Sequence, residues 1–179
     1  MPRVFILAPD FKNKSYRITA DVEIPEGGAE GVLMTQGGRF NGLGLYLLQG
    51  RPVFHYNLVG VERTTLAAKD ALAPGKHTIT LDFKYDGSGI GKGGVAMLTV
   101  DNKEVADGTL PRTIPFRVSA DETLDIGEDT GTPVSEDYHV PFKFNGTLHK
   151  VVIDLGEAKL SPQEQKELDQ QEGTNEVID

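Results

Sequence analysis

Alternation of apolar and polar residues with a period of two is the feature that most limits the folds open to this chain. In residues 16–24, apolar side chains occupy the even positions and charged or hydroxyl side chains occupy the odd ones. The same alternation returns at residues 79–85, 96–100 and 151–155. It is typical of β-strands that bury one face and expose the other. The sequence therefore predicts several half-buried strands.

Turn-forming residues separate these strands at short intervals. The chain has 21 glycines and 10 prolines among 179 residues, and turn clusters lie at 25–28, 49–52, 73–75 and 101–103. Short alternating strands divided by frequent turns are the pattern of β-sandwiches and β-barrels. An all-β fold built mainly from antiparallel strands is predicted.

One helix is predicted near the C-terminus. Ser161-Pro162-Gln163-Glu164 has the form of a capping box, with serine as the N-cap and proline at the first helical position. Gly173 is expected to end this helix. The chain is accordingly divided into a lead-in segment at 1–12, a β-sandwich domain at 13–160, and a short helix with an acidic tail at 161–179.

Charge and composition exclude several kinds of protein. With 18 basic and 27 acidic residues the net charge is −9, so nucleic acid and anionic membrane surfaces are not expected as partners. No apolar run approaches the roughly 20 residues of a membrane helix, and the run at 4–8 is too short for the core of an export signal. Localisation stays open between cytoplasm and periplasm. Cysteine is absent, which excludes disulfides, thiolate metal sites and cysteine nucleophiles.

An ordered series of motifs carries a resemblance to a known family. The motifs are the sequences at 29–33, 36–40, 44–46, 56–57, 85–87, 91–94 and 121–131. The chain resembles the C-terminal accessory domain of bacterial arylsulfatases of the alkaline-phosphatase-like superfamily, from about residue 13 to about residue 160. The resemblance implies a concanavalin-A-like jelly-roll sandwich that packs beside a sulfatase-type catalytic domain.

Sulfatase chemistry does not carry over to this chain. The family forms a formylglycine from a cysteine or serine that begins a C/S-x-P/S-x-R motif. This chain has no cysteine, and the sequences that follow Ser135 and Ser161 do not fit that motif. The leading hypothesis is a non-catalytic accessory or interaction domain, partnered by a sulfatase-type catalytic domain or by self-association. An independent carbohydrate-binding, lectin-like module is the alternative, and a sulfatase- or glucanase-type hydrolase is disfavoured.

The acidic segment 121–138 is the candidate metal site. It holds seven carboxylates and neither lysine nor arginine, so the charges repel one another unless a cation or hydrogen-bond donors compensate them. Calcium accepts six to eight oxygen ligands from flexible loops. The candidate calcium ligands are Asp121, Asp125, Asp129 and Asp137. The alternative is that these carboxylates are solvated or cap turns.

Residues 123–128 reproduce the spacing of the Glu-x-Asp-x-x-Glu strand in jelly-roll β-glucanases. Threonine stands at the nucleophile position, and Asp125 and Glu128 occupy the two other carboxylate positions. The nucleophilic carboxylate that a retaining glycosidase requires is therefore missing. Glycosidase activity is therefore not expected, and Glu128 is kept as a possible contact residue.

Three further residues are candidates for ligand or partner contact. Arg39, beside paired glycines, could bind a sulfate or carboxylate, or could form an ion pair with an acid of 121–137. Tyr56 and Tyr138 could stack on sugar rings or on a partner, or could belong to the core. The four histidines form no ligand-like spacing and are interpreted as hydrogen-bonded structural residues.

Overall fold

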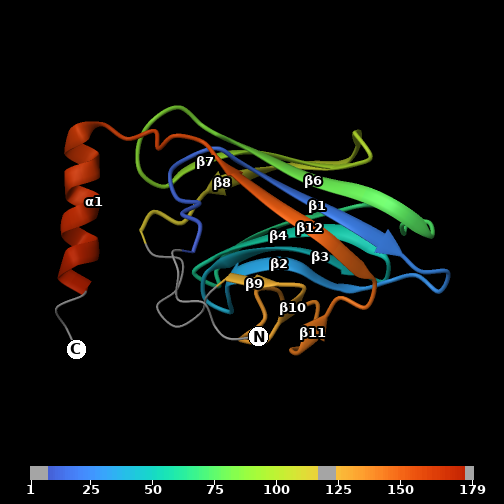
Figure 1. The fold of residues 1–179 in the computed structure, drawn as a ribbon. Helices are drawn as coiled ribbons and strands as arrows, with labels where there is room; N and C mark the ends of the chain where they lie inside the picture. Colours follow the sequence, from blue (N-terminus) through green and yellow to red (C-terminus); the bar gives the residue numbers. More distant parts are fainter. Residues whose placement is uncertain (1–7, 117–123, 176–179) are drawn as a thin grey trace.

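The computed structural model describes residues 8–116 and 124–175, which form two β-sheets packed face to face (Figure 1). The first sheet has the strand order β12-β1-β6-β7-β8 and the second β10-β11-β2-β3-β4-β5, with β9 also paired to β2. The strands of the first sheet are β1 Tyr16–Ile24, β6 Gly75–Tyr85, β7 Lys92–Val100, β8 Lys103–Arg112 and β12 Thr147–Leu155. Those of the second are β2 Gly31–Gly37, β3 Gly42–Leu48, β4 Arg51–Leu58, β5 Glu62–Ala67, β9 Leu124–Ile126, β10 Glu128–Asp129 and β11 Phe142–Lys143.

This architecture confirms the predicted all-β jelly-roll sandwich. Neighbouring strands pair antiparallel, apart from the short parallel contact of β11 with β2. Long antiparallel pairing in the first sheet joins β1 to both β6 and β12.

The first sheet buries one face, as the alternation predicts. Ile18, Leu81 and Leu98 point into the core between the sheets and are fully buried. The intervening positions, such as Arg17 and Asp82, face outward and carry polar groups. Each strand of this kind contributes about 1.5–3 kcal/mol for every large apolar side chain that it removes from water.

The second sheet is buried on both faces, which the alternation did not indicate. Every residue of β2, and all but one residue in each of β3 and β4, is buried. One face contacts the main core. The other face is covered by residues 130–141, a segment without regular structure that we call the cover segment. Burial on both faces explains why aromatic and apolar residues occupy both parities of β4.

The cover segment sits in a notch formed by two glycines of β3. A Cβ atom at Gly44 would lie 2.9 Å from Cγ1 of Val134, and one at Gly42 would lie 2.9 Å from Cγ2 of the same valine. Val134 and Tyr138 pack there against Tyr46 and form a second, smaller apolar cluster. Glycine is therefore required at these two strand positions because another chain segment approaches closely.

The C-terminal helix α1, Pro162–Asn175, begins as predicted and ends later than predicted. The capping box is formed: the Glu164 amide donates to Ser161 Oγ at 3.2 Å, and the Ser161 amide donates to Glu164 Oε2 at 2.8 Å. The expectation that Gly173 ends the helix is wrong, since the helix continues through it; glycine costs only about 1 kcal/mol within a helix. No helix of the described residues is long and apolar enough to span a membrane.

Candidate binding site

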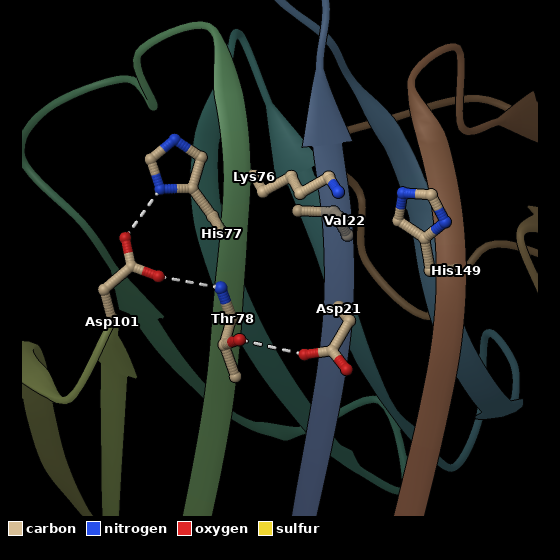
Figure 2. Close-up of a pocket in the computed structure, with 7 residues that line it drawn as sticks. All are labelled: Asp21, Val22, Lys76, His77, Thr78, Asp101 and His149. Atoms are coloured by element: carbon tan, nitrogen blue, oxygen red, sulfur yellow. Dashed lines mark hydrogen bonds and ion pairs between the residues drawn. The ribbon is translucent and has the colours of Figure 1, made fainter.

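A polar pocket of about 380 Å³ opens at one end of the first sheet (Figure 2). It spans strands β6, β1 and β12 and the turn between β7 and β8. The residues that line it are Asp21, Val22, Lys76, His77, Thr78, Asp101 and His149. We call it the His77 pocket.

Strand register brings these residues together from four distant parts of the sequence. Asp21 of β1 lies opposite Thr78 of β6 and, on its other side, opposite Lys150 of β12. The β7–β8 turn is made by Asp101 and Asn102, both at positive φ, which these residue types tolerate. The turn then folds Asp101 back against the start of β6, where its amide donates to the Thr78 carbonyl at 2.9 Å.

His77 connects two loops at the wall of the pocket. Its Nδ1 lies 2.7 Å from Asp101 Oδ2, and its Nε2 lies 2.8 Å from the carbonyl oxygen of Ala73. Both partners are acceptors, so the ring satisfies both hydrogen bonds only as the doubly protonated imidazolium. Burial lowers the pKa of His77, but the hydrogen bonds to Asp101 and Ala73 outweigh that effect, and the net pKa is raised.

The carboxylates of the pocket are already oriented by protein donors. Asp101 Oδ1 accepts the Thr78 amide at 2.8 Å, and Asp21 Oδ1 accepts the Thr78 hydroxyl at 2.9 Å. Figure 2 shows both bonds converging on Thr78 from opposite sides. Among the residues that the structure describes, the second oxygen of Asp21 has only the ammonium of Lys150, at 3.9 Å, as an ion-pair partner.

Two donors of the pocket keep bonding capacity for a ligand. The Lys76 ammonium makes no hydrogen bond or ion pair with any residue that the structure describes. In Figure 2 its side chain extends from β6 across to β1, above Val22. His149 uses Nε2 to contact Glu23 Oε2 at 3.1 Å, which leaves Nδ1 available. The pocket thus offers an ammonium, an imidazole nitrogen and a carboxylate oxygen, which suit a ligand rich in hydroxyl groups.

The candidate calcium ligands are engaged separately by protein donors. Asp125 Oδ2 accepts the Thr130 amide at 2.9 Å, whereas Asp137 Oδ2 accepts hydroxyl groups of Tyr46 and Ser135. Asp129 is buried and accepts the Tyr138 hydroxyl at 2.5 Å. Within residues 8–116 and 124–175, no group of three or more His, Asp or Glu side chains is placed to hold a metal ion. Asp121 lies outside the described residues, and the calcium site stays a prediction.

The tyrosines singled out as possible contact residues belong to the interior. Tyr56 is 6% exposed in the main core, where its hydroxyl accepts the Ile114 amide at 2.8 Å. Tyr138 is 5% exposed beneath the cover segment and stacks on Phe142 with ring centroids 4.7 Å apart. All five tyrosines of the chain are buried, so no tyrosine platform for sugar stacking exists.

Arg39 is exposed to solvent, whereas Glu128 is only partly exposed. Arg39 is exposed, and the predicted ion pair with an acid of 121–137 is not formed with any acid that the structure describes. Its loop is instead fixed through the backbone, because the Arg39 amide donates to Thr132 Oγ1 at 2.9 Å. Glu128 is half-buried in β10, where it pairs with Lys143 of β11 in the strand register.

Sequence reasoning missed the His77 pocket as a unit. His77 and His149 were interpreted as structural residues, which is correct for the hydrogen bonds of His77. The available signal was the Asp101-Asn102 turn, since a two-residue hairpin of this type fixes the register of β7 and β8. Nothing in the sequence indicated which strand would lie beside that turn.

The two packed antiparallel sheets place the chain among jelly-roll β-sandwiches. The sequence matches no protein-family model and no curated protein. Solved structures are similar at low identity. Domains LG4-5 of the mouse laminin α1 chain are 15% identical over 82% of this chain, with a TM-score of 0.58. The LG1-3 region of the laminin α2 chain is 18% identical over 83%, with a TM-score of 0.57.

A third similar structure is a single module. The CBM40 of the Ruminococcus gnavus IT-sialidase, bound to α2,3-sialyllactose, is 15% identical over 87% of this chain, with a TM-score of 0.54. This chain covers 80% of that module, but only 36% and 29% of the two laminin chains. At these identities the similarity establishes the jelly-roll fold.

Proposed function

We propose that this chain is a non-catalytic glycan-binding module that recognises its ligand at the His77 pocket. The observation that carries the proposal is the set of hydrogen-bonding groups there that no described residue uses, above all the Lys76 ammonium. The shared fold with a sialyllactose-bound module supports it. With its tyrosines buried, the module would bind a sugar through hydrogen bonds rather than ring stacking.

The second sheet is a less suitable ligand face. The cover segment fills its outer surface, with Val134 fully buried and Tyr138 in contact with Tyr46 at a centroid distance of 5.2 Å. A ligand would have to displace a packed apolar cluster to reach that surface. The open end of the first sheet requires no such displacement.

Calorimetric titration with lactose, sialyllactose and a heparin-derived oligosaccharide tests the proposal. We expect saturable binding of at least one of them and a loss of about tenfold in affinity in Lys76→Ala, the typical effect of removing a charged hydrogen-bond donor. Lys84→Ala is the matched control, because Lys84 is exposed on the same strand at its far end. Absence of saturable binding to all three, or an equal loss in both variants, would show the proposal to be wrong.

The accessory role beside a sulfatase-type catalytic domain stays a prediction from the sequence motifs. If this role is correct, we expect an upstream coding sequence with a formylglycine motif in the same reading frame. A genomic neighbourhood without such a sequence would contradict the accessory role.

A further inference from the structure

Two adjacent turns display apolar side chains at the end of the sandwich opposite the His77 pocket. They are the β2–β3 loop, residues 38–41, and the β4–β5 turn, residues 59–61, and we call this region the turn edge. Phe40 is 75% exposed, Val59 60% and Val61 88%. These are the three most exposed large apolar side chains among the described residues. Exposed apolar groups gathered on one surface are typical of interaction sites.

The turn edge is held rigidly by two asparagines. Asn41 Oδ1 accepts the Val59 amide at 2.6 Å, and Asn57 Oδ1 accepts the Gly60 amide at 2.9 Å. Buried Asn57 also donates to the Arg39 carbonyl at 2.7 Å, which ties one turn to the other. The apolar side chains are thus fixed in place before any contact is made, which lowers the entropic cost of association.

Val59 has an unfavourable backbone conformation in addition to its exposure. Its φ is +55°, in the left-handed region that β-branched residues avoid. Asparagine or glycine is the usual residue at a positive φ in a hairpin turn. Backbone outliers of this kind are found most often at functional sites.

A groove of about 360 Å³ lies beside the displayed side chains. Its walls are mostly apolar and include Val59, Val61, Ile90 and Pro115, while Arg112 and Glu62 form an ion pair at its margin, with Nε and Oε2 3.0 Å apart. Phe40 does not line this groove. The turn edge therefore presents both a projecting ring and an apolar recess.

The charges around the turn edge allow two copies of this chain to approach there. The protein carries a net charge of −9, so most surfaces of two copies repel each other. The turn edge itself holds the exposed cation Arg39, and beside it Arg63 pairs with Glu136 and Arg112 pairs with Glu62. Arg39 has no ion-pair partner among the described residues, whereas Glu136 is 80% exposed in its pair with Arg63. A surface with both signs of charge can complement itself across a twofold axis.

We propose that the turn edge is a homodimer interface in which Phe40 of each copy enters the groove of the other. The interface has the self-complementary character that a twofold contact requires, since ring and recess occur on the same surface. It goes beyond the proposed glycan binding and leaves the His77 pocket open in both copies, because the pocket lies at the opposite end of β6.

Sedimentation velocity of the full chain over a wide micromolar range tests this interface. We expect reversible dimer formation in the wild type and an association constant at least about tenfold lower in Phe40→Ala and in Val61→Asp. Val59→Asn should also weaken the dimer without risk to the fold, because asparagine readily adopts the left-handed conformation.

Val95→Asp is the matched control, since Val95 is 48% exposed on β7 of the first sheet. It should associate like the wild type. A wild type that sediments as a monomer at every concentration would overturn the proposal. So would a dimer that survives both Phe40→Ala and Val61→Asp, or one that Val95→Asp weakens equally.

Discussion

The contacts of His77 between two loops make the stability of the protein depend on pH. Its ring joins the β7–β8 turn to the loop before β6, and both of its bonds require the protonated form. Because the imidazolium is favoured in the folded state, the raised pKa of His77 makes a stabilising contribution below about pH 6.5, the ordinary pKa in an unfolded chain. This contribution is lost as the pH rises through the folded-state pKa.

We therefore expect the free energy of unfolding of the wild type to fall as the pH increases through the raised pKa of His77. Asp101→Asn should flatten that pH dependence, because it removes the carboxylate that favours the imidazolium. Asparagine keeps an acceptor for the Thr78 amide and tolerates the positive φ of the turn. Urea unfolding of both proteins across neutral pH provides the measurement, and parallel profiles would contradict the assignment.

The cover segment is the element that distinguishes this sandwich from one with an open second sheet. It has no regular structure, and side chains fix it: Val134 in the glycine notch, and Arg63 Nη1 2.9 Å from Glu136 Oε1. Beneath it His55 is 4% exposed, and its Nε2 has no hydrogen-bond partner within residues 8–116 and 124–175. Burial lowers the pKa of His55 to about 4, so the ring is neutral at pH 7.

Gly44→Ala tests how closely the cover segment packs. The new methyl group would lie 2.9 Å from Val134 Cγ1 and 3.1 Å from Thr35 Cγ2, so one of them must move. We expect the free energy of unfolding to fall by about 1–3 kcal/mol, the usual cost of overpacking. Gly27→Ala is the control, because nothing lies within 4 Å of a Cβ there. Equal stabilities of the two variants in urea would mean that the notch is not tightly filled.

For the whole molecule, stability resides in the two sheets and not in the helix. In Figure 1 helix α1 stands beside the sandwich, and its one buried apolar side chain, Leu168, belongs to neither apolar cluster. The segment before it is tied to the sandwich, since the Gly89 amide donates to the Lys159 carbonyl and the Lys159 amide to the Asn13 carbonyl.

A chain that ends at residue 160 should consequently keep the cooperative unfolding of the full chain. We expect its free energy of unfolding to lie within about 1 kcal/mol of the full-length value, because only peripheral contacts are removed. Denaturant unfolding followed by circular dichroism measures this. Loss of the cooperative transition would mean that the predicted boundary at 160 cuts through a folding unit.

The sequence by itself determined the elements whose signals are local. A period of two predicted β1, β6, β7 and β12, because successive side chains of a strand point to opposite faces. The capping box predicted where the helix begins, since both of its hydrogen bonds join residues three apart. The missing cysteines excluded thiolate chemistry whatever the fold.

Tertiary structure decided everything that depends on which segments meet. The cover segment buries Tyr138 and the second face of β4, so residues that could have contacted a ligand became core. The His77 pocket unites parts of three strands and one turn whose proximity follows from sheet order, which no local pattern encodes. The energy of such contacts comes from pairs far apart in the chain, and only the folded molecule specifies those pairs.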